Sequence, residues 1–117
     1  LDEAWKDDRI SEEEWKAKTG KEAPTTFQEA SHIICDGMAK MLISKNHKYG
    51  KDNILKFGQI GIFMRYWDKV CRLEQGIINM TDLGQEGLQE TWGDSAGYSL
   101  VGILLDKKWY QLPVVDN

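Results

Sequence analysis

The sequence has little of several features on which small proteins often depend. Only two cysteines occur among its 117 residues, at positions 35 and 71, so we expect neither a disulfide framework nor a zinc site of closely spaced cysteines. No apolar run approaches the roughly 18 residues that a membrane-spanning helix needs, and we expect no signal peptide. We find no glycine-rich phosphate loop and no nucleophile elbow of the strand–turn–helix type. These absences favour a protein of a reducing compartment without a membrane span.

Charge is present in quantity but is unevenly distributed. The net charge is −4, and we therefore expect no direct binding to duplex nucleic acid, whose ligands are usually basic. Residues 40–72 nevertheless carry eight bases and two acids, while the segments before and after this middle third are acidic. A basic stretch beside isolated acids is typical of a site for phosphate and metal. The alternative is a solvated surface on which charges form blocks.

Apolar residues recur at helical spacing in three stretches, and no stretch has the alternation of a strand. We predict an all-α fold, a bundle of three long helices over residues 26–44, 60–75 and 88–106, with short N-terminal helices. Residues 45–53 are predicted to form a polar loop, with at most a short helical turn near 54–57. The predicted segments are an N-terminal helical appendage (1–24), an all-α domain (25–106) and an irregular tail (107–117).

Local signals mark the ends of these helices. Ser11 and Glu14 have capping-box spacing, and Gly20 is placed to end the short helix that follows. Thr26 is the predicted N-cap of the first long helix, with Glu29 three residues later. Gly76 is predicted to end the second long helix. Gly93 and Gly97 lie four apart inside the third, which predicts a close approach of another helix.

Acidic residues on the predicted helices are candidates for a metal site. Asp94 lies in mid-helix among small residues, where a carboxylate needs a cation, a hydroxyl or a metal as its partner. Glu90 lies one turn earlier, and Asp68 is the candidate on the preceding helix. Mg²⁺ accepts a few carboxylates and completes its shell with water and phosphate oxygens. The alternative is that Glu90 and Asp94 are surface acids paired with Lys69 or Arg72.

Four short motifs follow one another along the middle and the end of the chain. They are residues 45–53 (KNHKYGKDN), Phe57-Gly58 with Gly61, residues 65–73 (RYWDKVCRL) and residues 90–98 (ETWGDSAGY). This ordered set, within residues 27–105, resembles the nucleotide-modification-associated domain family of phages and prophages. That family is similar to the MazG-like branch of all-α nucleoside triphosphate pyrophosphohydrolases.

The resemblance implies a helical fold completed by oligomerisation, as a homodimer or tetramer, in the cytoplasm of a bacterial host cell. It also implies Mg²⁺, with Mn²⁺ as the alternative ion, held by helix carboxylates. Asp94 matches the second acid of the family's ExxD pair, with Thr91 at the position of the first and Glu90 beside it. Asp68 matches the second acid of the earlier ExxE pair, and Arg65 stands at the position of the first.

Two hypotheses follow. The first is a Mg²⁺-dependent pyrophosphohydrolase that cleaves a (deoxy)nucleoside triphosphate to the monophosphate and pyrophosphate. Its catalytic residues would be Asp68, Asp94 and Lys69, its metal ligands Asp68, Glu90 and Asp94, and its phosphate- or nucleotide-binding residues Lys45, Asn46, Tyr49, Asn53, Arg65, Lys69 and Arg72. The second is a non-enzymatic module that keeps the fold without a full metal site and senses nucleotides or binds a protein partner through residues 1–24.

Overall fold

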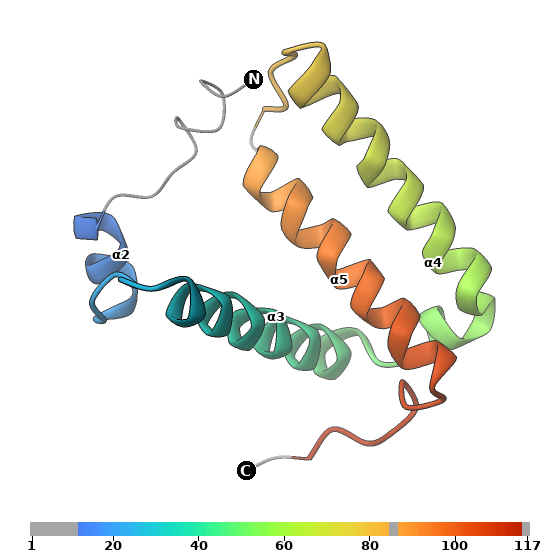
Figure 1. Ribbon diagram of the computed structural model, residues 1–117. Coiled ribbons are helices and arrows are strands. Elements are labelled where there is room, and N and C mark those ends of the chain that lie inside the picture. The colour runs from blue at the N-terminus through green and yellow to red at the C-terminus, as the bar shows by residue number, and fades with distance from the viewer. Residues whose placement is uncertain (1–11, 85–86, 116–117) are drawn as a thin grey trace. The chain divides into compact units, whose positions relative to one another are not determined.

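The computed structural model describes residues 12–84 and 87–115 and is all-α, as predicted (Figure 1). The described residues form α2 (Glu12–Thr19), α3 (Phe27–Tyr49), α4 (Asp52–Leu73), a π-helical segment η1 (Glu74–Ile78) and α5 (Leu88–Asp106), with no strand among them. None of these helices is both long and apolar enough to cross a membrane. The chain forms two compact units, residues 1–37 and 38–117, and α3 contributes to both. The three segments predicted from the sequence stay a prediction.

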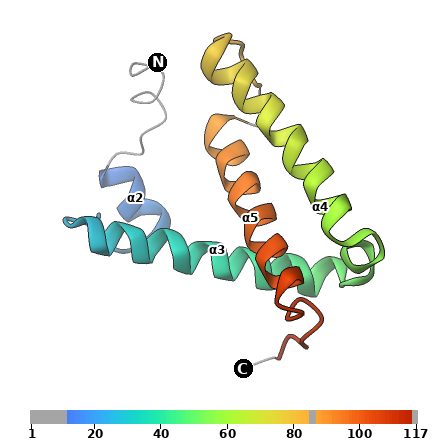
Figure 2. The same cartoon turned by 45° about the vertical axis from the view of Figure 1, so that its right-hand side comes forward.

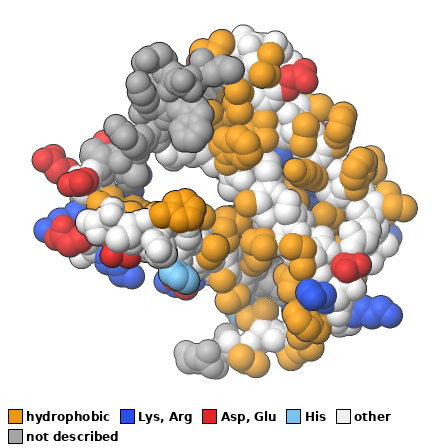
Figure 3. Space-filling view, in the orientation of Figure 1, with side chains coloured by type: hydrophobic (Ala, Val, Ile, Leu, Met, Phe, Trp, Pro, Cys, Tyr) orange, Lys and Arg blue, Asp and Glu red, His pale blue; other side chains and the backbone are white. Residues whose placement is uncertain are grey.

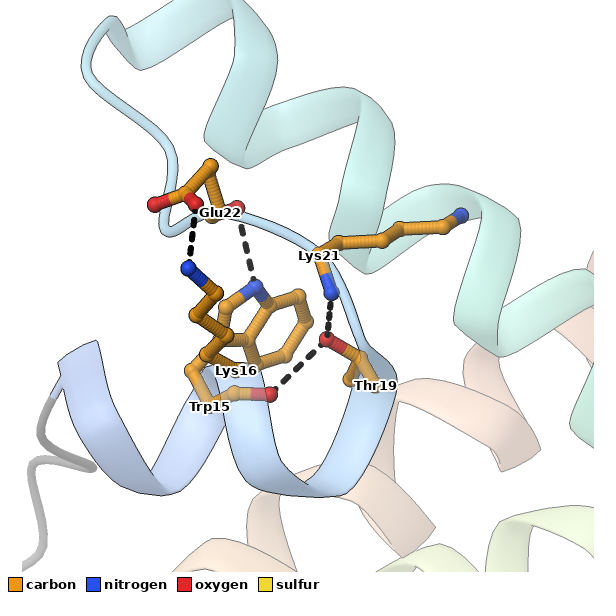
Figure 4. Close-up of polar contacts among 5 residues, drawn as sticks. All are labelled: Trp15, Lys16, Thr19, Lys21 and Glu22. Atoms are coloured by element: carbon orange, nitrogen blue, oxygen red, sulfur yellow. Dashed lines mark hydrogen bonds and ion pairs between the residues drawn. The ribbon is translucent and has the colours of Figure 1, made fainter.

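Unit 1 contains α2 and a turn held by local polar contacts (Figure 4). Gly20 adopts a left-handed φ of 71° and ends α2, which confirms the predicted stop. After the turn, the Trp15 indole N–H donates to the carbonyl of Glu22 (3.1 Å), and the Lys16 ammonium lies 2.8 Å from the Glu22 carboxylate. These contacts are exposed, so they orient the turn and add little stability. The predicted cap at Ser11 lies outside the described residues.

The N-terminus of α3 is capped as the sequence predicts. The backbone N–H of Glu29 donates to the Thr26 hydroxyl oxygen (3.1 Å), which satisfies one of the amides without a partner inside the helix. The Glu29 carboxylate in turn accepts from the backbone N–H of Thr25 (3.0 Å). This reciprocal pair is a capping box shifted by one residue from the ideal arrangement.

The predicted loop over residues 45–53 is wrong for most of its length, because α3 continues to Tyr49. Residues 45–49 contain neither glycine nor proline, so nothing local interrupts the helical hydrogen bonds. The chain leaves the helix at Gly50, which has φ 77° and donates its N–H to the carbonyl of Asn46 (2.8 Å). As a result, the polar residues of this segment follow a helix instead of a loop.

The second long helix begins earlier than predicted, and its α-helical part ends at Leu73, where the π-helical segment η1 continues it to Ile78. It starts at Asp52 and bends at Gly58, whose φ of 56° and ψ of −140° lie outside the helical region. Gly76 does not end it. Gly76 lies inside the π-helical segment, and a Cβ at this position would lie 2.8 Å from the Leu83 side chain. The missing side chain therefore leaves room for the connection to α5.

In unit 2, α4 and α5 lie side by side and antiparallel, and both views show this pairing (Figures 1 and 2). The bounds of α5 are those predicted. The buried apolar core consists of Ile62 from α4, Val101 from α5 and Tyr110 from the tail, and half-buried side chains of α3, α4 and α5 pack around it. Thr91 and Ser95 are also buried, and their hydroxyls donate to the carbonyls four residues earlier, those of Gly87 and Thr91. Tyr110 thus brings the tail into the core.

The two glycines expected to mark a close helix approach behave differently. A Cβ at Gly97 would lie 3.0 Å from the Met41 side chain of α3, so this part of the prediction is confirmed. No atom lies within 4 Å of a Cβ placed on Gly93. At Gly61, a Cβ would lie 2.7 Å from the Phe57 Cβ. Of these three glycines, only Gly93 is therefore free to accept a side chain.

We expect Gly93→Ala to raise the free energy of unfolding by up to about 1 kcal/mol, because alanine loses less backbone entropy in a helix. The matched change Gly61→Ala is expected to lower it by about 1 kcal/mol, since the close Phe57 contact must be relieved. Urea denaturation followed by circular dichroism measures both values. Equal effects of the two substitutions would contradict the conclusion that Gly93 has room for a methyl group and Gly61 does not.

Candidate functional site

Unit 2 contains a cavity of about 350 Å³ between the second half of α3, the facing parts of α4 and α5, and the C-terminal tail. Polar and aromatic side chains share its wall with aliphatic ones. The polar and aromatic members are Lys45, Asn46, Tyr49, Asn53, Arg65, Asp94, Tyr98, Trp109 and Tyr110. Five of the seven residues predicted to bind phosphate or nucleotide are among them, although they come from two different helices. The fold therefore assembles most of the predicted binding set around one space.

Asp94 is the acidic side chain of this wall, and it has two lysine partners. Its Oδ2 lies 3.1 Å from the Nζ of Lys69, and its Oδ1 lies 3.7 Å from the Nζ of Lys45. The Asp94 and Lys69 side chains are only 20% and 15% exposed, whereas Lys45 is 55% exposed. The partner expected for a mid-helix carboxylate is thus a pair of cations. Lys69 is the closer and more buried of the two.

The other predicted metal ligands do not join Asp94. Asp68 and Glu90 are exposed and do not line the cavity. Among residues 12–84 and 87–115, no three histidine, cysteine or acidic side chains lie close enough together to hold a metal ion. The cations beside Asp94 take up the negative charge that a metal would need. The described side chains therefore do not fit a resident Mg²⁺ site.

Of the predicted phosphate-binding residues, Lys69 and Arg72 lie outside the cavity wall. Both are half-buried on α4. Lys69 forms an ion pair with Asp94, which does line the cavity. Arg65 does line the cavity, and together with Lys45 it provides the positive charge of the wall.

Asn46 connects the polar wall to the tail. Its Oδ1 accepts a hydrogen bond from the Lys51 ammonium (2.6 Å), and its side chain also bonds the phenol of Tyr110. Burial raises the pKa of that phenol above its usual value, while the Asn46 bond and the nearby Arg65 charge act in the opposite direction. Tyr110 is therefore a neutral phenol at physiological pH.

The tail is the part of the site that sequence reasoning missed. Trp109, Tyr110, Leu112 and Val114 all line the cavity. The Trp109 ring is 54% exposed and carries the Lys107 ammonium 5.1 Å from its centre. An aromatic pair directly after a helix was the available signal. Its position over the cavity depends on how the tail folds back.

Ser95 lies directly after Asp94 and belongs to a motif that resembles a catalytic one. Residues 93–97 (GDSAG) have the spacing of a nucleophile elbow, which places a serine on a sharp turn between strand and helix. Here Ser95 is 6% exposed inside α5, and its hydroxyl donates to the carbonyl of Thr91 (2.9 Å). Ser95 is therefore not placed as a nucleophile elbow would place it.

Comparisons of this chain with protein families, curated proteins and solved structures found no match.

Proposed function

We propose that unit 2 binds a nucleoside triphosphate in the cavity. The observation that carries this proposal is the convergence of two cations, two amides and several aromatic rings on a space of about 350 Å³. Cavities of roughly 300–1,000 Å³ are typical of small-molecule sites. Lysine and arginine suit phosphate oxygens, and aromatic rings suit the face of a base. A cytoplasmic site of action is part of the proposal.

The arrangement around Asp94 favours binding without cleavage, as in a nucleotide-sensing module. Both Asp94 oxygens face lysine ammonium groups, and Asp68, Glu90 and Asp94 form no metal-holding group in the part of the chain that the structure describes. In this proposal, Lys45 turns from Asp94 to the phosphates when the ligand enters, because it is the more exposed and more distant of the two lysines. Lys69 stays on Asp94 and keeps the carboxylate neutralised.

Pyrophosphohydrolysis is the second candidate, and the position of Asp94 in the cavity wall favours it. A triphosphate brings Mg²⁺ with it, and its own oxygens supply most of the ligands that the ion needs. Bound in this way, Mg²⁺ supplies charge neutralisation and activation of water. Asp94 would then orient the complex, while Arg65 and Lys45 would hold the pyrophosphate that leaves.

Calorimetry with a panel of ribo- and deoxyribonucleoside triphosphates, with and without Mg²⁺, tests the proposal. We expect saturable binding of at least one triphosphate, weaker binding of its monophosphate, and no release of pyrophosphate. If pyrophosphate is released only with Mg²⁺, and the Asp94→Asn variant releases none, the protein is a pyrophosphohydrolase and not a nucleotide sensor. Absence of binding by every triphosphate would refute both.

The two neighbouring lysines of α3 provide a matched test of the site. Lys45 lines the cavity, whereas Lys48, three residues later, does not. We expect Lys45→Met to weaken triphosphate binding by about 10- to 100-fold, the usual effect of losing one charged hydrogen bond. Lys48→Met makes the same change in net charge and is expected to change the dissociation constant less than about threefold. Similar losses of triphosphate affinity in both variants would indicate that net charge, and not a direct contact of Lys45 with the triphosphate, determines binding.

A further inference from the structure

The cavity of unit 2 has a charged end and an apolar end. Asp94 and its partner Lys45 lie at the charged end, and the described wall has only one further charged residue, Arg65 of α4. Leu104, which also lines the cavity, lies about 15 Å further along the axis of α5 than Asp94. The tail continues the wall from there with four residues, and none of them is charged. The cavity therefore suits a ligand that carries its negative charge at one end and an uncharged group at the other.

The position of Arg65 agrees with this polarity. The Gln59 side chain of α4 donates to the carbonyl of Gly102 on α5 (3.0 Å). Further along α4, the Lys69 ammonium lies 3.1 Å from the Asp94 carboxylate. Arg65 lies between Gln59 and Lys69 in the chain, so its level along α5 falls between those of Gly102 and Asp94. The charges of the wall thus occupy its Asp94 end and its middle.

The apolar end is formed where the tail follows α5. The backbone N–H of Trp109 donates to the Leu104 carbonyl (2.9 Å), and the Trp109 carbonyl accepts from the N–H of Leu112 (3.1 Å). Tyr110, the next residue, is buried in the core. The space-filling view shows hydrophobic side chains gathered over the end of α5 and the tail (Figure 3). The backbone of Trp109 is therefore held on both sides before a ligand arrives, which lowers the entropy cost of binding.

Four aromatic rings line the cavity, and they differ in what they can offer to a ligand. Tyr110 is buried, and Tyr98 is half-buried against the same core, so both rings are largely occupied by protein contacts. Tyr49 is exposed, but it follows Lys45 by one turn of α3 and so lies beside a group assigned to the phosphates. Trp109 is 54% exposed and belongs to the uncharged tail. It is the ring best placed to contact an uncharged, flat part of a ligand.

We propose that Trp109 stacks on the base of the bound nucleotide, so that the triphosphate extends toward Arg65 and Lys45. This inference rests on the proposed function, because it orients the ligand of the same cavity. Every base has a π-face, so an aromatic side chain stacks on each of them. Trp109 thus contributes affinity for the nucleoside part and discriminates little among bases. Trp109 lies outside residues 27–105, so none of the four sequence motifs predicts this contact.

Calorimetry with two kinds of probe tests the inference: the panel of nucleoside triphosphates, and inorganic triphosphate, which has no base. We expect Trp109→Ala to weaken the binding of nucleoside triphosphates by about 5- to 100-fold, the usual effect of losing one stacked base. The same variant should change the dissociation constant of inorganic triphosphate less than about twofold. Lys45→Met should weaken both kinds of probe, since both carry phosphates. Trp109→Phe keeps an aromatic ring and should retain most of the affinity.

The matched control is Trp92→Ala, because Trp92 is also 54% exposed but lies on α5 outside the cavity wall. We expect it to leave the affinity for both probes unchanged. If the natural chain binds nucleoside triphosphates and Trp109→Ala binds them as tightly as Trp92→Ala does, the stacking inference is overturned and the proposed function stands. Equal losses of nucleoside and inorganic triphosphate in Trp109→Ala would also overturn it, because the tail would then shape the cavity without contacting the base. Absence of binding by the natural chain would overturn both proposals.

Discussion

Replacing Tyr110 by alanine is expected to lower the free energy of unfolding by about 3–5 kcal/mol, the usual cost of removing a large aromatic ring from a core. Tyr110 is one of only three apolar residues that are buried in the described part of the chain. It packs in the same cluster as Ile62 and Val101. Small domains are stable by about 5–15 kcal/mol, so this loss is a large fraction of the total. Urea denaturation followed by circular dichroism measures it.

The matched control is Tyr110→Phe, which keeps the ring and removes only the hydroxyl that bonds Asn46. We expect a loss of about 1 kcal/mol, the typical net contribution of one hydrogen bond. Losses of similar size in the two variants would mean that the hydrogen bond, and not the ring, holds the tail in place. A negligible loss in both would contradict the assignment of Tyr110 to the core.

Removing the Asp94 carboxylate has the second large expected effect. We expect Asp94→Ala to lower the free energy of unfolding by about 2–3 kcal/mol, because the variant loses the charged contact of 3.1 Å between Asp94 and the Lys69 ammonium, whose side chains are only 20% and 15% exposed. Lys45 is more than half exposed and lies at 3.7 Å, so its contact with Asp94 adds less than about 1 kcal/mol. Thermal and urea unfolding of Asp94→Ala, Lys69→Ala and the double variant measure the coupling.

The same variants separate the two candidate functions. If Asp94 only neutralises Lys45 and Lys69, its removal leaves more positive charge at the cavity and should strengthen triphosphate binding severalfold. If Asp94 orients a Mg²⁺–triphosphate complex for cleavage, its removal should abolish pyrophosphate release. Additive effects of the Asp94→Ala and Lys69→Ala substitutions on stability would refute an energetic coupling between Asp94 and Lys69.

The helices were predictable wherever their signals are local. The bounds of α5, the cap formed by Thr26 and Glu29 and the end of α2 at Gly20 were all predicted, because periodicity and capping involve residues within a few positions of one another. The extension of α3 to Tyr49 was missed because polar residues suggested a loop. They lie on a helix whose polar residues face the cavity or solvent, and only Gly50 provides a backbone stop.

The binding residues were predicted in part. Lys45, Asn46 and Tyr49 were grouped with Arg65, and all four line one cavity. The sequence also required a partner for Asp94 but left the choice open between a cation, a hydroxyl and a metal, with Lys69 or Arg72 as the alternative to a metal. Lys69, 25 positions away in the chain, takes that place. Helical spacing alone does not determine which faces of two helices meet, since that depends on how their side chains pack.

The sequence by itself determined that this protein is helical, where α5 begins and ends, where α3 begins, where α2 ends, and that Asp94 needs a partner. Only the tertiary structure decided that Tyr110 of the tail packs in the core, that Trp109 and Tyr110 line the cavity, and that Asp68, Glu90 and Asp94 form no metal-holding group among the described residues. The physical reason is how far apart in the chain the contacting residues lie. Helix formation depends on contacts within a few residues, whereas a site depends on packing between segments distant in the chain.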